Sequence, residues 1–315
     1  MNKIAFVFPG QGSQTVGMGK ELADKHSEVM DFFRRADKKL NIPLSNLIFD
    51  GPKEELTITY NTQPALLTTS IAILDYFQKF GIKADYVAGH SLGEYTALVA
   101  AGTLSFEEGV YVVRKRGEFM ENAVPNGEGS MAAILGLDRD RLFAVTNEVS
   151  ESGNPVSLAN LNCPGQIVIS GSRKGVELAS AKAKEAGAKR ALPLEVSGPF
   201  HSTLMKPAAD QLREVLDGIE MKDAEVPIVA NVTAEPVSSA SEMKDKLIEQ
   251  LYSPVLWEDS VRKMIELGVD TFIEVGPGKV LSGLIKKIDK TVTTFSVSDE
   301  ESAQSVIDAL KEEKI

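Results

Sequence analysis

Residues 86–94 read Tyr86-Val87-Ala88-Gly89-His90-Ser91-Leu92-Gly93-Glu94, a short apolar run that ends in Gly-X-Ser-X-Gly. Residues 95–101 follow directly and are rich in alanine, which predicts a helix. A strand, a sharp turn and a helix in this order are typical of a nucleophile elbow, where glycines let neighbouring backbones approach closely. A plain strand-to-helix turn is the competing interpretation. Because strand and helix are both present, the stretch favours a serine nucleophile at the carboxyl edge of a sheet.

The composition narrows the class of protein. The chain has 315 residues, enough for one large domain with an insertion or for two domains. A formal net charge of -11 argues against a general nucleic-acid binder. The single cysteine, Cys163, excludes an internal disulfide and a cysteine-based zinc site, and we expect no metal. No apolar run is long enough for a signal peptide or a membrane span, so we expect a cytoplasmic protein with no membrane partner.

Strands and helices alternate in the two outer parts of the chain, residues 1–125 and 200–315. This alternation is typical of the α/β class, in which helices cover both faces of a parallel sheet. Ser27, Pro64 and Ser105 are expected where three helices begin, as caps or first-turn residues. Besides the run before Ser91, the predicted strands cover residues 3–8, 228–231, 271–275 and 291–297, and the longer helices cover 28–40, 62–80, 105–123, 241–251, 257–267, 279–288 and 302–311.

Residues 126–199 carry a different pattern, β-α-β-β-α-β, which is the ferredoxin-like order. We therefore expect a small inserted α+β subdomain over residues 126–199, with residues 1–125 and 200–315 forming one discontinuous α/β-hydrolase-like domain. Asn160 and Asn162 lie near the hairpin turn of the insertion and could face Ser91 across a cleft. Turn chemistry alone is the other explanation for asparagines there.

The loop after the first strand is rich in glycine and reads Pro9-Gly10-Gln11-Gly12-Ser13-Gln14. It does not fit a dinucleotide-binding fingerprint, because Thr15 stands where a third glycine or alanine is needed. It does not fit a Walker loop either, because Met18 stands where the lysine is needed. Two interpretations remain: a plain turn, or a loop that donates backbone N–H groups beside the edge of the sheet.

Arg116 lies in the middle of the apolar face of its predicted helix. At about 100° per residue, Val112, Val113 and Met120 all fall within about 60° of it. A buried arginine needs a carboxylate or phosphate partner. Two alternatives are open at this point: a structural ion pair with an internal glutamate, or a site for an anionic substrate.

A serine nucleophile needs a general base, and the chain has three histidines. His26 lies in a stretch rich in lysine and glutamate and is expected at the surface. His90 immediately precedes Ser91, so its side chain should point away from the serine. His201 follows a Gly-Pro turn and comes after the serine in the chain, as in α/β-hydrolases. Elimination therefore favours His201. The aspartates between the two residues suit a helix start better than a triad, which suggests a Ser-His dyad.

Five short motifs span the chain: Phe8-Pro9-Gly10-Gln11-Gly12-Ser13-Gln14, Gly89-His90-Ser91-Leu92-Gly93-Glu94, Arg114-Lys115-Arg116-Gly117, Asn160-Leu161-Asn162 and Glu274-Val275-Gly276-Pro277. In order and spacing they resemble the malonyl-CoA:acyl carrier protein transacylases of bacterial fatty acid synthesis and the acyltransferase domains of polyketide synthases. Each motif alone is a modest signal, and their combination over the full length is a specific one.

The resemblance implies the catalytic roles. Ser91 would be the acylated nucleophile and His201 its base. The backbone N–H groups of Gln11 and Leu92 would form the oxyanion hole, which gives the glycine-rich loop a function. The main-chain carbonyl of Gln250 would orient His201 in place of an aspartate.

The resemblance also implies the substrate contacts. Arg116 would hold the malonyl carboxylate in a bidentate pair, with Asn160, Asn162, His90 and Phe200 around the acyl group. Phe200 departs from many stand-alone members, which have a small residue before the histidine. It resembles the malonyl-selective polyketide acyltransferases, so this motif leaves the choice among malonyl-type groups open.

The predicted function is transfer of a malonyl group from malonyl-CoA to the phosphopantetheine thiol of holo acyl carrier protein, in fatty acid biosynthesis. The reaction would be ping-pong, through a Ser91 ester, in a monomer without a metal or bound cofactor. One alternative is a serine hydrolase or thioesterase on acyl-CoA, and another is an acyltransferase of a polyketide pathway. A catalytically silent interaction module is the alternative from a different class.

Overall fold

Two separate sheets organise the protein in the computed structural model, which describes residues 3–312. The larger sheet has six strands in the order β10-β9-β1-β2-β7-β8, and all neighbours are parallel except β7 and β8. Its strands are β1 (Lys3–Phe8), β2 (Tyr86–Gly89), β7 (Ile228–Val229), β8 (Pro236–Val237), β9 (Val269–Val275) and β10 (Thr293–Val297). The predicted parallel sheet with flanking helices is confirmed.

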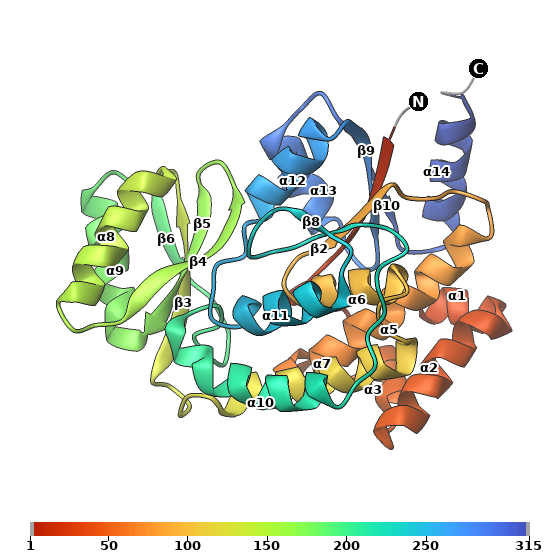
Figure 1. Ribbon diagram of the computed structural model, residues 1–315, viewed down its shortest axis with the longest axis horizontal. Helices are drawn as coiled ribbons and strands as arrows, with labels where there is room; N and C mark the ends of the chain where they lie inside the picture. The colour runs from red at the N-terminus through yellow and green to blue at the C-terminus, as the bar shows by residue number, and fades with distance from the viewer. Residues whose placement is uncertain (1–2, 313–315) are drawn as a thin grey trace.

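Helices cover both faces of this sheet (Figure 1). Successive residues of β1 point to opposite faces, so Phe6 and Phe8 join one buried cluster while Ala5 and Val7 join another. The second cluster is made with α12 (Trp257–Glu266) and α13 (Val280–Ile288). The first cluster is larger and involves α1 (Lys20–Lys25), α2 (Ser27–Leu40), α3 (Leu44–Asp50), α4 (Lys53–Thr57), α5 (Thr59–Gln78), α6 (Leu92–Ala100), α7 (Phe106–Asn122), α10 (Lys206–Asp217), α11 (Ala240–Gln250) and α14 (Glu300–Glu312).

Of the three predicted helix starts, one was confirmed, one was displaced by a single residue and one was wrong. The Ser105 hydroxyl accepts a hydrogen bond from the Glu108 N–H and caps α7, as expected. Ser27 is the first residue of α2 and His26 is its N-cap, because the extended His26 backbone also closes α1. Pro64 lies inside α5 and does not open it. Since α5 is buried along most of its length, tertiary packing outweighs the local preference for proline at a helix start.

The smaller sheet has the strand order β4-β5-β3-β6 with antiparallel neighbours throughout. It consists of β3 (Gly129–Leu135), β4 (Val156–Cys163), β5 (Gln166–Ser172) and β6 (Arg190–Pro193), and it packs against α8 (Arg139–Glu151) and α9 (Arg173–Glu185) around a core of its own. β4 contacts the larger part of the protein, because the Leu161 N–H donates to the Val255 carbonyl at 2.9 Å and the Val255 N–H donates to the Ala159 carbonyl at 2.8 Å. The smaller sheet therefore extends sideways from the larger one (Figure 1).

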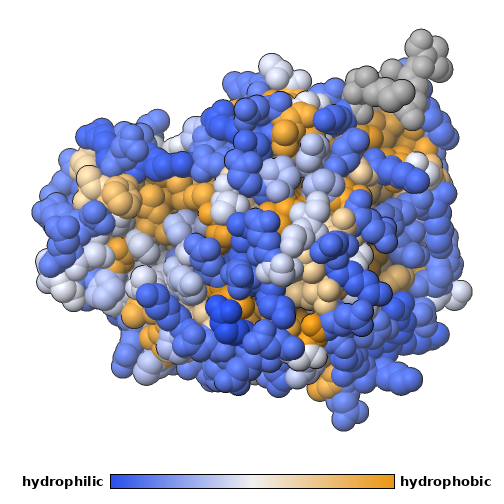
Figure 2. Space-filling view, viewed as in Figure 1, coloured by the Kyte–Doolittle hydropathy of each residue, from blue (hydrophilic) through white to orange (hydrophobic). Residues whose placement is uncertain are grey.

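Hydrophilic residues cover most of the face shown in Figure 2. Of the helices within residues 3–312, none is long and apolar enough to cross a membrane.

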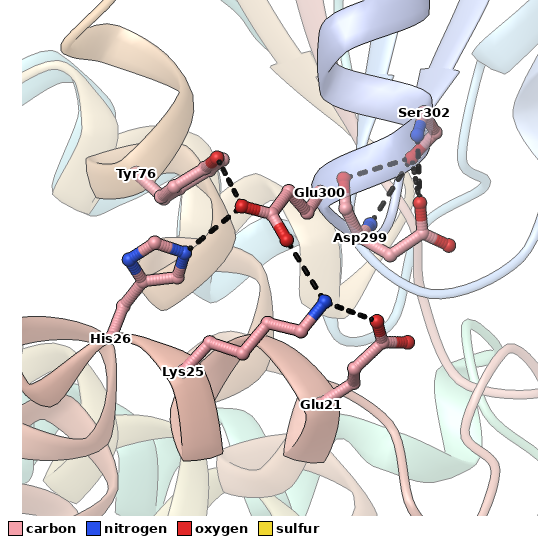
Figure 3. A network of polar contacts seen from close by, with 7 residues as sticks. All are labelled: Glu21, Lys25, His26, Tyr76, Asp299, Glu300 and Ser302. Carbon is pink, nitrogen blue, oxygen red and sulfur yellow. Dashed lines mark hydrogen bonds and ion pairs between the residues drawn. The ribbon is translucent and has the colours of Figure 1, made fainter.

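The last helix is tied to the N-terminal helices by a polar network around Glu300 (Figure 3). One carboxylate oxygen of Glu300 accepts a hydrogen bond from Lys25 Nζ at 2.9 Å. The other lies 3.4 Å from His26 Nε2 and 3.5 Å from the Tyr76 hydroxyl. His26 was predicted at the surface, and its side chain is one-quarter exposed. The network brings α1, α5 and α14 together.

Candidate active site

The turn at Ser91 depends on the two glycines that flank it. A Cβ atom added at Gly89 would lie 1.9 Å from the carbonyl carbon of Gly93, and one added at Gly93 would lie 2.1 Å from the carbonyl oxygen of Phe8. Only glycine permits these approaches. Ser91 lies between the end of β2 and the start of α6. Its backbone adopts φ 51° and ψ -106°, a conformation that residues other than glycine rarely take. The strain holds the hydroxyl at the carboxyl edge of the parallel sheet.

His201 lies against the Ser91 hydroxyl. Its Nε2 is 2.7 Å from Ser91 Oγ, and its Nδ1 is 2.8 Å from the main-chain carbonyl oxygen of Gln250. A carbonyl only accepts, so Nδ1 carries the proton and Nε2 presents its lone pair to the serine. Burial and the nearby Arg116 lower the pKa of His201 to about 3, so the imidazole is neutral over the physiological range. The structure brings together the nucleophile, base and orienting carbonyl named from the sequence.

Two backbone N–H groups beside Ser91 are free to bind an oxyanion. At the start of α6, Ser91 N–H donates to Asn231 Oδ1 at 2.8 Å and Gly93 N–H donates to the His90 carbonyl at 2.9 Å. Within residues 3–312, the Leu92 N–H between them has no protein acceptor, and the same holds for the Gln11 N–H. Gln11 lines the same cavity as Ser91. Both N–H groups predicted as the oxyanion hole are therefore available.

Arg116 is 1% exposed and reaches Ser91 from α7. Its Nη1 donates to Gln63 Oε1 at 2.7 Å, and its Nη2 donates to Gln250 Oε1 at 2.9 Å and to Ser91 Oγ at 3.1 Å. Its Nε, which is buried, has no hydrogen-bond partner in the described part of the chain. No carboxylate of residues 3–312 lies within 4.0 Å of the guanidinium. In the part of the chain that the structure describes, Arg116 therefore makes no direct ion pair with an internal glutamate. Burial lowers the pKa of Arg116.

The remaining predicted substrate contacts surround a cavity of about 130 Å³. Asn160 and Phe200 line it together with Ser91. Asn162 is not among the residues that line the cavity. Its Oδ1 lies 2.7 Å from His90 Nε2. His90 also lines the cavity, and its side-chain contact with Asn162 joins the turn to the smaller sheet.

Sequence reasoning missed three polar residues of this site. Asn231 accepts from the Ser91 N–H and donates to the Gly89 carbonyl at 2.7 Å, which fixes the backbone on both sides of the turn. Gln63 accepts a hydrogen bond from Arg116, and Glu94 accepts one from the Gln250 side chain. Asn231 had a usable signal, since it follows the buried strand β7 at the edge where active sites form. Gln63 had none, because only the tertiary fold brings α5 against α7.

Comparison with known proteins gives one consistent result. Residues 5–313 match the acyl transferase domain family. The chain is 63% identical over 313 residues to malonyl CoA-acyl carrier protein transacylase of Bacillus subtilis, with 99% of each chain covered. The Escherichia coli K12 protein of the same name is 49% identical over 300 residues, covering 95% of this chain and 97% of that one.

Solved structures agree with these relatives. An acyl carrier protein S-malonyltransferase from Vibrio cholerae superposes with a TM-score of 0.95 at 46% identity, covering 97% of this chain and 100% of that one. A malonyl-transacylase in complex with its type II polyketide acyl-carrier protein also gives 0.95, at 45% identity, covering 98% of this chain and all of that chain.

Proposed function

The chain belongs to the acyl transferase domain family, and on that basis we propose that it moves malonyl groups by a ping-pong mechanism through an ester on Ser91. It is an enzyme, an acyltransferase between malonyl-CoA and acyl carrier protein in fatty acid biosynthesis. The observation that carries the mechanism is the 2.7 Å contact between Ser91 Oγ and His201 Nε2. A monomer in the cytoplasm that needs no bound cofactor is part of the same proposal.

The first half-reaction acylates the serine. Ser91 Oγ attacks the thioester carbonyl carbon of malonyl-CoA while His201 Nε2 takes its proton. The oxyanion that forms accepts hydrogen bonds from the free N–H groups of Leu92 and Gln11, which are in place before the reaction begins. Collapse of the tetrahedral intermediate breaks the carbon–sulfur bond, and His201 returns the proton to the departing thiolate. Coenzyme A leaves and the malonyl group stays on Ser91.

The second half-reaction runs the same chemistry in reverse with another thiol. The phosphopantetheine thiol of acyl carrier protein gives its proton to His201 and attacks the ester carbonyl. The same two N–H groups stabilise the second oxyanion. Ser91 leaves with the proton from His201, and the product is the malonyl thioester of the carrier. The main-chain carbonyl of Gln250 keeps the imidazole in the required tautomer in both halves.

Arg116 is proposed to recognise the malonyl carboxylate. Its guanidinium lies 3.1 Å from Ser91 Oγ, so the free end of a malonyl ester on Ser91 comes within its reach. Its neighbours Gln63 and Gln250 are neutral. They orient the planar guanidinium without neutralising its charge. An acetyl group offers no carboxylate, so this contact favours malonyl over acetyl.

We further propose that the turn at Ser91 is a nucleophile elbow and that residues 126–199 are a ferredoxin-like subdomain inserted between residues 1–125 and 200–315. The strand order β4-β5-β3-β6 supports the second assignment. Met131 and Asn160 from this subdomain line the cavity at Ser91, which suits a roof over the acyl group. Such a roof limits access of water to the ester.

Incubation with malonyl-CoA and no acceptor tests the proposal and separates it from its competitors. A stable malonyl adduct, found by intact mass and absent in Ser91→Ala, is the expected result. Continuous release of coenzyme A without an adduct would indicate a thioesterase. No reaction at all would indicate a catalytically silent module.

A further inference from the structure

Glu94 is a buried carboxylate close to the reaction centre that the mechanism above does not use. It lies in the first turn of α6 and is 1% exposed. Its Oε1 accepts from the Asn231 backbone N–H at 2.8 Å, and its Oε2 accepts from Gln250 Nε2 at 2.6 Å. No lysine or arginine of residues 3–312 lies within 4.0 Å of it. A charge this deeply buried requires compensation from further away.

The Gln250 side chain provides that connection. Arg116 has only donors, so the amide oxygen of Gln250 must face Arg116 and the amide nitrogen must face Glu94. The amide thus bridges the buried cation and the buried carboxylate, at 2.9 Å on one side and 2.6 Å on the other. Both oxygens of Glu94 face N–H donors, which is the arrangement that an ionised carboxylate satisfies. When Glu94 is ionised, it therefore forms an ion pair with Arg116 that one amide mediates.

We propose that Glu94, in its ionised form, is the counter-charge of Arg116 and takes up one proton when a malonyl carboxylate pairs with that arginine. This inference rests on the proposed function. The substrate brings a second negative charge to a single guanidinium in a water-poor site, and two carboxylates sharing one cation raise each other's proton affinity. A proton from solvent converts Glu94 to the neutral acid.

The pKa directions of the surrounding groups agree with this geometry. Burial raises the pKa of Glu94 to about 8, while its hydrogen bonds and Arg116 act in the opposite direction. Burial lowers the pKa of His90, and burial with Arg116 lowers that of His201 to about 3. Burial raises the pKa of Tyr95, and Arg116 retains its charge.

The charged group facing Glu94 from α11 is Lys246, which is paired with Glu242 at 3.2 Å. Of the groups in the site, Glu94 is therefore the one that titrates near pH 8.

The consequence is a selectivity that depends on pH. Below pH 8, Glu94 of the free enzyme already carries the proton, and malonyl binds without further uptake. Above pH 8, the proton must be acquired on binding, so the reaction with malonyl-CoA weakens as pH rises. Acetyl-CoA brings no carboxylate, so its reaction should not depend on the protonation of Glu94. The ratio of kcat/KM for malonyl-CoA to that for acetyl-CoA should fall about tenfold between pH 8 and pH 9.5.

The first test compares this ratio in wild type, Glu94→Gln and Glu94→Asp. Glu94→Gln has no proton to exchange, so its ratio should be flat across this range. Glu94→Asp keeps a titrating carboxylate and should keep the fall, even if its rates are lower. A ratio in Glu94→Gln that falls as in wild type would overturn the proposal, since Glu94 would then be merely structural.

The second test measures the proton directly and does not require turnover. Ser91→Ala is titrated calorimetrically with malonyl-CoA and with acetyl-CoA at pH 8.5. The heat of binding is compared in two buffers of different ionisation enthalpy, which gives the number of protons taken up. We expect uptake of roughly half to three-quarters of a proton with malonyl-CoA and none with acetyl-CoA. The double variant Ser91→Ala with Glu94→Gln should show no uptake. Equal uptake for both ligands, or uptake that persists in the double variant, contradicts the inference. The proposed function would still stand if wild type forms the malonyl adduct, so the two failures are distinguishable.

Discussion

Two polar networks in this protein have similar distances and opposite surroundings. Around Gln250, contacts of 2.6 to 2.9 Å join Glu94 to Arg116, and all three residues are at most 1% exposed. Around Glu300, Lys25 makes contacts of 2.8 and 2.9 Å with side chains that are 42% exposed or more. Water screens the second set and is excluded from the first. We therefore expect the same geometry to affect catalysis in the buried network and to contribute little in the exposed one.

The largest effect is expected where the buried network meets the reacting atoms. Ser91→Ala should abolish acyl-enzyme formation, because no other group is placed to accept the malonyl group. His201→Ala should slow acylation by about 10² to 10⁴-fold, the usual range for a general base. Single-turnover acylation followed by mass spectrometry measures both.

His26→Ala, in the exposed network, is the matched control and should acylate at the wild-type rate. A catalytic defect in His90→Ala that His201→Ala lacks would show that the wrong histidine was chosen.

The next effect concerns selectivity and the charge of Arg116. A charge-assisted contact is worth about 1.5 to 3 kcal/mol, so Arg116→Ala should lower kcat/KM for malonyl-CoA by about tenfold to a hundredfold or more. The acetyl-CoA reaction should fall less, or rise, because the enlarged cavity is no longer charged.

Arg116→Lys should rescue only part of the malonyl activity, since lysine offers a point charge in place of the planar fork. An equal fractional loss for malonyl-CoA and acetyl-CoA in Arg116→Ala would mean that the arginine is structural.

The sequence predicts the residues that act through local pattern and misses those that act through the fold. Ser91 follows from the glycine-bracketed turn, and the face of α7 identifies Arg116 as buried, whereas the role of Leu92 was implied by the family resemblance. Gln250 was predicted only for its main-chain carbonyl. Its side chain contacts Arg116 and Glu94 across more than a hundred residues of chain, and no local periodicity reports such a contact.

The same limit applies to the fold. The strand at residues 3–8 is confirmed with its predicted bounds, because a continuous apolar run marks a buried parallel strand. The strand predicted at 228–231 ends at Val229, and Asn231 leaves the sheet to bind the backbone at Ser91. The start of α5 was misplaced because burial, and not Pro64, decides where that helix begins.

A smaller effect is expected in the acid range, where the buried histidine should not titrate. The folded-state pKa of His201 is lowered to about 3, so the base is already neutral as pH falls from 7.5 to 5.5. Acylation by malonyl-CoA should vary by less than about twofold over this range, whereas a histidine with its ordinary pKa near 6.5 would give about tenfold. The effect on stability has the opposite sign to that of a salt-bridged histidine. Below about pH 6.5 the unfolded state binds a proton at His201 and the folded state does not. The free energy of unfolding therefore declines as pH falls toward 3. A tenfold fall in the acylation rate, centred near pH 6.5, would show that His201 is solvated.

The smallest effect is expected in the exposed network, and it tests the comparison from the other side. Glu300→Gln keeps the shape of the side chain and one acceptor oxygen, and it removes the charge that faces Lys25 and His26. Exposed pairs gain little because water solvates each partner almost as well, so Tm should fall by less than about 2 °C. High salt should erase most of the difference, since these charges are screened, and acyl transfer should match wild type. Thermal unfolding at low and high salt, run beside Glu94→Gln, measures the contrast. The contrary outcome is that Glu300→Gln lowers Tm more than Glu94→Gln does, and that high salt leaves this difference in Tm unchanged. Burial would then not separate the two networks, and contacts other than screened ion pairs would hold α14 in place.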